Sequence, residues 1–270
     1  MLRGHAVRKQ RPNRTGGLVS DPIRLGLFFL LITNMAFTFF FRDAETLAAG
    51  VAKALPAMQG QCYIRVWDAG CAHGPEPYTL AILLRKQMSD FLFRNVRILA
   101  TDVDAGFGEQ VANGIYPEGE LQRMPPDVFD DYFHKTADPG FFQVADEIRA
   151  RVEFSRHDLL SLQPIRQGLT MIVCKNVLLH FSERQRCAVL KMFHQALRAD
   201  GLLVMEHTQK MPESLRPRFD QVTAGAQIYR KRATEPDKQV RIDASAKPAP
   251  GAVRLLFPAE EEAGRALVNG

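Results

Sequence analysis

The sequence predicts an open α/β fold of the nucleotide-binding type, with a mostly parallel sheet and helices on both faces. An apolar run from Tyr63 to Trp67 enters a loop with Gly70 and Gly74, and a helix with Pro77 in its first turn follows. A strand, a glycine loop and a helix open such folds. Apolar runs and amphipathic helices then alternate over residues 61–232, which favours a parallel sheet.

Six segments read as strands: 63–67, 96–101, 151–155, 169–174, 202–206 and 226–231. The helix after Phe181 is well marked, because Ser182 and Gln185 have capping-box spacing. One apolar face of that helix is made by Val189, Leu190, Phe193 and Leu197. Gly201 is predicted to end the helix as a left-handed cap.

The domain organisation follows from composition. Prolines interrupt the alternation over residues 115–150, where Phe141–Val144 reads as a short strand. From residue 233 on, Pro, Ala, Gly and charged residues predict a flexible tail, with a short helix over Glu260–Leu267 as the alternative. We expect five parts: a disordered basic arm (1–21), a helical lead-in or lid (22–60), the main α/β domain (61–232), an inserted subdomain within it (115–150) and a flexible tail (233–270).

Bulk composition favours a globular protein without disulfide bonds. The 270 residues are 46% hydrophobic, which can supply a real core, and the net charge of +5 is mild. The basic arm reads as a solvated terminus, with contact to nucleic acid or anionic lipid as the alternative. The four cysteines lack Cys-x-x-Cys spacing and the histidines lack ligand spacing, so we expect buried free thiols in a reducing cytosol and no bound metal.

The apolar run over residues 25–41 resembles a signal anchor, because it follows the basic arm. It has seventeen residues, fewer than the usual span of about twenty, and Thr33, Asn34 and Thr38 interrupt it. We interpret it as a buried helix and strand-like segment that packs on the main domain. A membrane anchor is the alternative.

Several motifs resemble those of the CheR-type chemoreceptor methyltransferases, which use S-adenosylmethionine. The glycine loop, Ala-Gly-Cys-Ala-His-Gly-Pro-Glu-Pro-Tyr-Thr, follows the family's Ala-Gly-Cys-Ser-Thr-Gly-Glu-Glu-Pro-Tyr-Ser. Further matches, in order over residues 36–232, are Ala100–Asp104, Gly114–Tyr116, Val152–Phe154, Asp158–Leu160, Cys174–Leu178, Gly201–Glu206 and Ile228–Arg230. The resemblance implies a Rossmann-like methyltransferase fold with a small inserted antiparallel subdomain, which docks a receptor's C-terminal peptide in some members. The family's helical N-terminal region is shortened here.

The resemblance also implies a cation near the reacting groups. The family motif Asn-x-Thr-x-Phe-Phe-Arg places Thr38 and Arg42 in the donor site, with Ala36 at the Asn position unless Asn34 replaces it. The planar fork of Arg42 suits both oxygens of an acceptor carboxylate. The alternative is a surface arginine that ends an apolar run.

The resemblance implies further donor-binding residues. Glu76 would bind the donor's amino group or ribose, although an acid also favours a helix N-terminus. Asp102 would bind the ribose, or alternatively cap the next helix, for which Asp104 is the better candidate and leaves Asp102 free. Asp158 and Leu159 would contact the adenine.

The resemblance extends to the segment after the fourth strand. Asn176 and Val177 would bind the donor at the sheet's carboxyl edge, where open α/β folds bind ligands. Two positions in this segment depart from the family: Lys175 replaces Arg, and His180 replaces a Tyr near the transferred methyl group. In the glycine loop, Pro75 replaces an acid. His180 would line the pocket or, alternatively, cap a helix.

Methylating a glutamate requires little from the protein, because a carboxyl group with a pKa of about 4.3 is already ionised at neutral pH. Positioning alone can supply roughly 7–11 kcal/mol. The resemblance predicts a cytoplasmic, S-adenosylmethionine-dependent protein-glutamate O-methyltransferase that acts on a chemoreceptor-like protein in chemotaxis adaptation. We expect membrane association only through the receptor, no stable insertion and no nucleic acid.

Three alternatives remain open. One is a CheR-like methyltransferase with another target, and a second is a donor-binding regulatory module with low activity. A membrane-anchored signalling adaptor is the third, and it depends on residues 25–41 alone.

Overall fold

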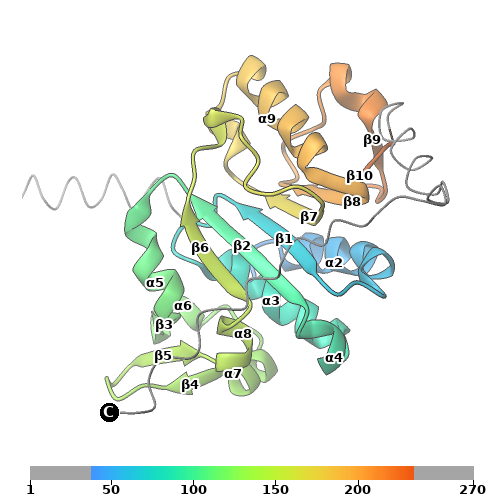
Figure 1. Ribbon diagram of the computed structural model, residues 1–270. Helices are drawn as coiled ribbons and strands as arrows, with labels where there is room; N and C mark the ends of the chain where they lie inside the picture. The colour runs from blue at the N-terminus through green and yellow to red at the C-terminus, as the bar shows by residue number, and fades with distance from the viewer. Residues whose placement is uncertain (1–37, 234–270) are drawn as a thin grey trace, which may run out of the picture.

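The computed structural model describes residues 38–233, and Figure 1 shows their architecture. The arm, the tail and most of the apolar run at 25–41 lie outside the described residues. A seven-stranded sheet in the order β6-β2-β1-β7-β8-β10-β9 forms the centre. Its strands are β1 (Ile64–Ala69), β2 (Val96–Asp102), β6 (Val152–Arg156), β7 (Leu169–Cys174), β8 (Leu197–Met205), β9 (Phe219–Gln221) and β10 (Ile228–Lys231). The predicted fold class is confirmed.

The first five strands of that order run parallel, and β10 lies antiparallel to both β8 and β9. Ile64 pairs with Val96 and Val66 with Met171, so β1 is central. Strand β7 is buried at every position, as a central parallel strand must be. The carboxyl ends of β1, β2, β7 and β8 therefore meet at one edge of the sheet.

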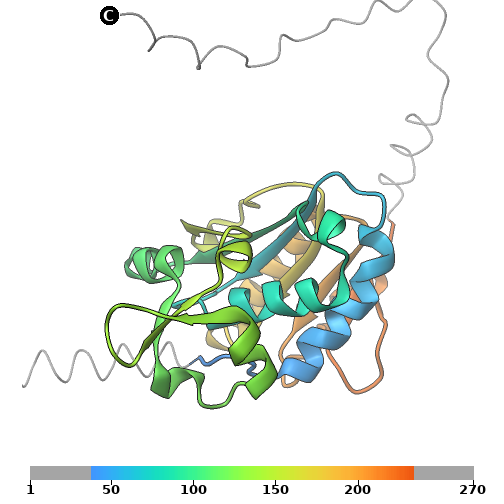
Figure 2. The same ribbon diagram turned by 90° about the horizontal axis from the view of Figure 1, so that it is seen from below.

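Helices cover the two faces of the sheet. On one face α2 and α3 lie side by side, as Figure 2 shows, and α9 covers the other face over β7 and β8 (Figure 1). The helices are α2 (Ala44–Met58), α3 (Pro75–Gln87), α4 (Asp90–Phe93), α5 (Gly108–Asn113), α6 (Glu118–Leu121), α7 (Pro126–Tyr132), α8 (Asp146–Arg149) and α9 (Glu183–Ala196). Short 3₁₀ turns are η1 (Ala105–Phe107), η2 (Leu159–Ser161), η3 (Leu178–His180) and η4 (Glu213–Arg218). Among the described residues, none of these helices has the length and apolarity that crossing a bilayer requires.

Helix α9 begins as predicted and ends differently. Ser182 and Gln185 form the capping box, with the Ser182 side chain accepting from the Gln185 amide. The predicted glycine cap is wrong, because the helix ends at Ala196 and Leu197 already belongs to β8, where it pairs with Leu169 of β7. Asp200, with φ of 64°, takes the left-handed conformation.

A second, three-stranded antiparallel sheet lies within residues 115–144, in the order β3-β5-β4. Its strands are β3 (Ile115–Pro117), β4 (Phe133–Lys135) and β5 (Phe141–Val144), the last of which was predicted. Phe40 is fully buried and meets the rings of Tyr116 and Phe133 edge-on, with centroids 4.8 and 5.3 Å away. The segment before α2 is thus packed against this small sheet.

The four cysteines are free thiols, as predicted, but they are not all buried. Cys71 and Cys174 lie in the core at the carboxyl edge of the sheet, whereas Cys62 is exposed just before β1. Cys62 precedes the first buried strand residue, Ile64, and Tyr63 between them is also exposed. The first strand therefore starts one residue later than the apolar pattern predicts.

Candidate functional site

The glycine loop after β1 lies tight against the segment that follows β7. Gly70 has φ of 98°, and a Cβ there would lie 2.1 Å from Cγ2 of Val177. Gly74 has φ of 108°, and its Cβ would lie 2.4 Å from the hydroxyl oxygen of Tyr116. Glycine alone avoids both the clash and the left-handed strain. The Gly70 amide also donates to the Thr101 carbonyl at 2.8 Å, which fixes the loop on β2.

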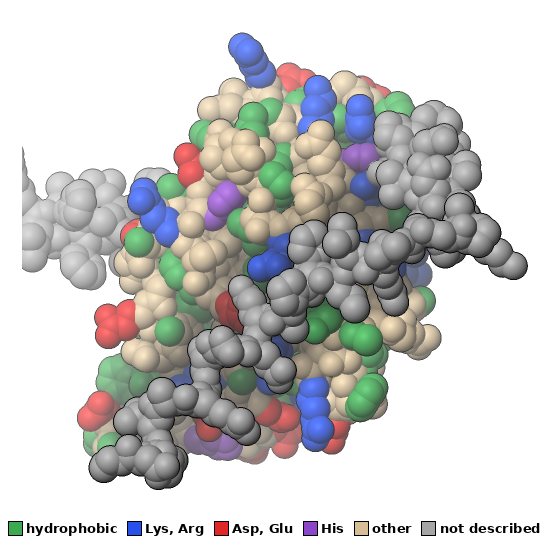
Figure 3. Space-filling model, viewed as in Figure 1, with side chains coloured by type: hydrophobic (Ala, Val, Ile, Leu, Met, Phe, Trp, Pro, Cys, Tyr) green, Lys and Arg blue, Asp and Glu red, His purple; other side chains and the backbone are tan. Residues whose placement is uncertain are grey.

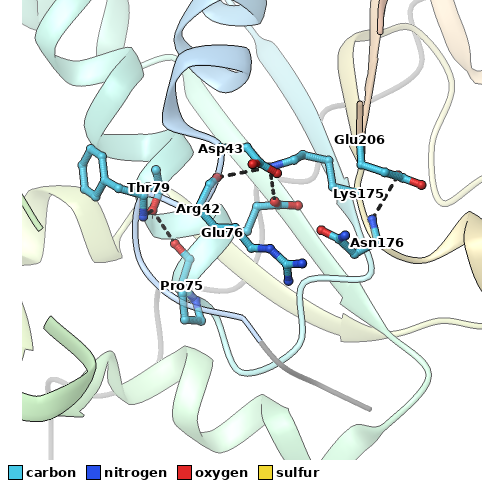
Figure 4. A network of polar contacts seen from close by, with 9 residues as sticks. Arg42, Asp43, Pro75, Glu76, Thr79, Lys175, Asn176 and Glu206 are labelled. Atoms are coloured by element: carbon cyan, nitrogen blue, oxygen red, sulfur yellow. Dashed lines mark hydrogen bonds and ion pairs between the residues drawn. The ribbon is translucent and has the colours of Figure 1, made fainter. Parts of the chain in front are cut away.

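A buried lysine joins three segments at this edge. The side chain of Lys175 is 1% exposed, and its Nζ lies 3.3 Å from Oε2 of Glu76 and 3.3 Å from Oδ2 of Asp43. The same ammonium group donates to the Arg42 carbonyl at 3.2 Å. Lysine has three N–H donors, so one ammonium group can face all three of these oxygens. Lys175 therefore holds Glu76 and the chain before α2 together (Figure 4).

The segment before α2 is also bound to the first turn of α3. The Phe41 amide donates to Oγ1 of Thr79 at 3.0 Å, and that hydroxyl donates to the Pro75 carbonyl at 2.7 Å. Phe41 has φ of 60°, a left-handed conformation that this bond helps to hold. Figure 4 shows the side chains of Arg42 and Glu76 pointing toward the same space. Thr38, which sequence reasoning grouped with Arg42, is half-buried.

Asn176 turns the chain after β7 and contacts the end of β8. Its φ of 60° is left-handed, and its amide donates to Oε2 of Glu206 at 3.0 Å. Glu206 is 3% exposed, and burial raises the pKa of its carboxyl group. The other oxygen of Glu206 has no hydrogen-bond partner among the described residues. The bond fixes the backbone of Asn176 and Val177 beside the glycine loop.

The sequence predicted that Asp102 is left free, but both of its carboxylate oxygens accept hydrogen bonds. Its Oδ2 accepts from the Ala72 amide at 3.0 Å, and its Oδ1 accepts from the Asp104 amide at 3.1 Å. Asp104 does cap the next turn, since its Oδ1 accepts from the Gly106 amide at 2.8 Å. A carboxylate has about four acceptor positions. Asp102 therefore orients the glycine loop and keeps capacity for a ligand hydroxyl.

Three of the predicted site residues belong to two short 3₁₀ turns. Asp158 is exposed and caps η2, with its Oδ1 accepting from the Leu160 amide at 2.8 Å. Leu159 is buried in the core beside it, and His180 is exposed at the end of η3. Their roles toward a ligand stay predictions.

Sequence reasoning missed three members of the site. Asp43 was not considered, and Lys175 was read only as a weaker arginine, whereas it is the cation on which the cluster depends. Asp68, at the end of the first apolar run, is fully buried. An acid inside an apolar strand is the one signal that could have identified it.

This strand order, with a glycine loop after β1 and an acid at the end of β2, defines a Rossmann-like methyltransferase. Residues 36–228 match the family model described as "CheR methyltransferase, SAM binding domain". The chain therefore belongs to the CheR methyltransferase family, and the resemblance read from its motifs is confirmed.

Named relatives agree with this assignment. The chain is 30% identical over 180 residues to a chemotaxis protein methyltransferase of Borreliella burgdorferi, covering 64% of this chain and 63% of that protein. It is 32% identical over 189 residues to that of Salmonella typhimurium, covering 69% and 64%. A Vibrio cholerae chemotaxis protein methyltransferase 2 is 28% identical over 180 residues, covering 64% and 62%. The chain spans just under two thirds of the length of these relatives.

S-adenosylmethionine is the cofactor of the matched domain, and the residues at the carboxyl edge fit it. The loop at Gly70 lets backbone approach a ligand closely, because no Cβ intervenes. Glu76 is 9% exposed, and its side chain points toward the same space as that of Arg42. An acid and an arginine suit the ammonium and carboxylate ends of an amino acid.

Proposed function

We propose that this chain transfers the methyl group of S-adenosylmethionine to glutamate side chains of a chemoreceptor-like protein. The observation that supports it most is the attachment of the Phe41–Arg42 segment to the glycine-loop helix. The Phe41 amide bonds Thr79, and the Arg42 carbonyl bonds Lys175, which also pairs with Glu76. The side chains of Arg42 and Glu76 point toward the same space, which supports a site where Arg42 and a donor-binding acid act together.

The residues would divide the work between donor and acceptor. S-adenosylmethionine, when bound, supplies a methyl group on a positively charged sulfur. We assign donor binding to Thr38, Gly70, Gly74, Glu76, Asp102, Asp158, Leu159, Asn176 and Val177, with Arg42 reaching both ligands and His180 lining the acceptor side. The Arg42 guanidinium would bind the acceptor carboxylate through two N–H donors. No general base is needed, because that carboxylate is already ionised at neutral pH.

The partner and the place of action belong to the same proposal. The relatives are named chemotaxis protein methyltransferases, which supports a receptor of that signalling system as the substrate. Lys and Arg side chains are scattered among Asp and Glu over the face drawn in Figure 3, outside the grey residues. Such mixed charge suits a protein partner better than nucleic acid. We place the enzyme in the cytoplasm, at the membrane only through its receptor.

A methyl-transfer assay tests the proposal. The full chain is mixed with methyl-labelled donor and with membranes that contain the cognate receptor, and alkali then releases labelled methanol from glutamate methyl esters. Receptor whose candidate glutamates are replaced by alanine is the control. We expect alkali-labile label on the parent receptor only.

Two other outcomes would contradict the proposal. Label on a different protein would favour another target. Donor binding by calorimetry without any transfer would favour a regulatory module, for which the replacements at Ala36, Pro75, Lys175 and His180 are the sequence argument.

A further inference from the structure

Asp68 is a fully buried acid that the proposed chemistry does not use. It lies in β1, two residues before Gly70, with 0% exposure. Neither of its carboxylate oxygens accepts a hydrogen bond from a donor among the described residues. An ionised carboxylate in that setting would carry a large desolvation cost, so the group needs either a donor or a proton of its own.

The nearby cation is not in contact with Asp68. The Lys175 ammonium group pairs with Asp43 and Glu76 and donates to the Arg42 carbonyl, and among the described residues it forms no ion pair with Asp68. Lys175 therefore lowers the cost of a charge on Asp68 only through space, and it already balances Glu76.

A second carboxyl group, that of Glu76, lies within hydrogen-bond reach of Asp68. Two carboxylates cannot bond each other unless one of them carries a proton. Burial first, and then the negative charge of Glu76, raise the pKa of Asp68 well above its ordinary value. Three further charged groups face this pair. Lys175 lowers the pKa of Asp68, whereas the negative charge of Asp102 raises it. Glu206 adds a negative charge near Glu76. The thiol of Cys71 is also close, and its raised pKa keeps it neutral.

The surroundings decide which carboxyl group holds the proton. Glu76 is 9% exposed and its Oε2 lies 3.3 Å from the Lys175 ammonium group, so its charged form is the better stabilised. Asp68 has neither solvent nor a cation in contact. The proton therefore resides on Asp68.

We propose that Asp68 is a positioning residue that keeps its proton at neutral pH and donates it to Glu76. Glu76 then presents one fixed, singly charged carboxylate to an ammonium-bearing ligand. The inference rests on the proposed function only in taking that ligand to be S-adenosylmethionine. Asp68 acts through Glu76 and needs no contact with the donor.

Infrared spectroscopy tests the proton without any ligand. At neutral pH we expect the wild-type protein to show the C=O stretching band of a protonated carboxylic acid, which shifts in heavy water and is lost in Asp68→Asn. The exposed Asp104→Asn variant is the matched control and should keep the band. Absence of the band from the wild type, or its persistence in Asp68→Asn, would overturn the inference.

Calorimetry with S-adenosylmethionine tests the positioning role. Asparagine can donate an N–H to Glu76, so Asp68→Asn should keep the donor's Kd within about 3-fold. Asp68→Leu has similar size and no donor, and it should raise Kd at least about 10-fold. The wild type should lose affinity at high pH, where Asp68 ionises and its hydrogen bond is lost, while Asp68→Asn should not.

Equal affinities of the two folded variants, or the same pH profile in Asp68→Asn and the wild type, would refute the positioning role. If Asp68→Leu does not fold, the infrared band and the pH profile of Asp68→Asn still decide. A wild-type protein that shows the band and binds no donor would refute the proposed function instead, so the two failures are distinguishable.

Discussion

The ammonium group of Lys175 lies 3.3 Å from the carboxylate of Glu76, with both side chains almost completely buried. Their backbones belong to different elements, the end of β7 and the first turn of α3. The pair therefore fixes the glycine-loop helix relative to the central sheet. A buried ion pair tolerates the loss of one partner poorly, because the other charge then stays behind uncompensated.

Lys175→Met should consequently destabilise the protein by about 3 kcal/mol. Urea unfolding followed by circular dichroism measures the change in the free energy of unfolding. Lys86→Met removes a surface lysine whose Nζ lies 2.8 Å from Asp127, and it should leave that free energy nearly unchanged. Similar effects of the two substitutions would mean that the Lys175 cluster has no structural importance.

Arg42→Ala should lower the rate of methyl transfer about 10- to 100-fold, because charge-assisted hydrogen bonds contribute about 1.5–3 kcal/mol. Its effect on the donor's Kd should be within about 3-fold, since a residue that orients the acceptor acts on the transfer step. Steady-state kinetics and calorimetry separate the two. Arg123, which also lies over the Phe39 ring, provides the control Arg123→Ala, with an unchanged rate. Equal losses of rate and donor affinity would mean that Arg42 binds the donor only and does not orient the acceptor.

Asp102→Ala should weaken binding of S-adenosylmethionine at least about 10-fold. The substitution removes both the acceptor that orients the Ala72 amide and the acid expected to bind the ribose. Asp104→Ala, which removes only the cap of η1, should change the Kd no more than about 2-fold, which corresponds to roughly 0.5 kcal/mol at an exposed site. Calorimetry measures both, and donor binding by Asp102→Ala as tight as that of the parent would disprove the assignment.

Gly70→Ala combines backbone strain with a clash against Val177. Gly60→Ala isolates the strain, because Gly60 has φ of 72° and open space around its Cβ position. We expect Gly60→Ala to cost about 1 kcal/mol and Gly70→Ala about 2 kcal/mol more, as overpacking does. Adding Val177→Ala should recover part of the second loss. Chemical unfolding of the wild type, the two single glycine variants and the double variant measures these free energies. Equal losses of stability at the two glycines would mean that the loop relaxes away from Val177.

Glu206 gives the fold a dependence on pH. Because burial raises its pKa above the ordinary 4.5, the folded protein binds a proton that the unfolded chain has released. Stability from this group is therefore complete below about pH 4.5 and falls as the pH rises through the folded-state value. Glu206→Gln keeps an oxygen acceptor for Asn176 and should flatten that fall. The free energy of unfolding is measured across this pH range, with the exposed Glu183→Gln as control. If Glu206→Gln shows the same pH dependence as Glu183→Gln and the wild type, the prediction is wrong.

The elements that the sequence predicts well are those with a local cause. Strand β7 was predicted with its observed bounds, because a run of buried apolar residues admits little else. The start of α9 follows from two side chains, Ser182 and Gln185. Its end does not, since Leu197 leaves the helix to pair with Leu169, a contact that no local pattern encodes. Strand β9 has only three residues and no apolar run to mark it.

The site shows the same division. The two glycines and Asp102 are recognisable because they follow strands at characteristic positions. The role of Lys175 depends on contacts with Arg42 and Glu76, which are 133 and 99 residues away along the chain. Asp68 follows an apolar run, which is a sequence signal, but its complete burial is determined by the fold.

The small three-stranded sheet is joined to the glycine loop more closely than its place as an insertion implies. The Tyr116 hydroxyl donates to the His73 carbonyl at 2.8 Å, and only a glycine at position 74 leaves room for that hydroxyl. Phe40 packs between the same tyrosine and Phe133. Exchanging this sheet between family members would therefore fail as a simple graft. The sheet would have to be exchanged together with position 74 and the residues that precede α2.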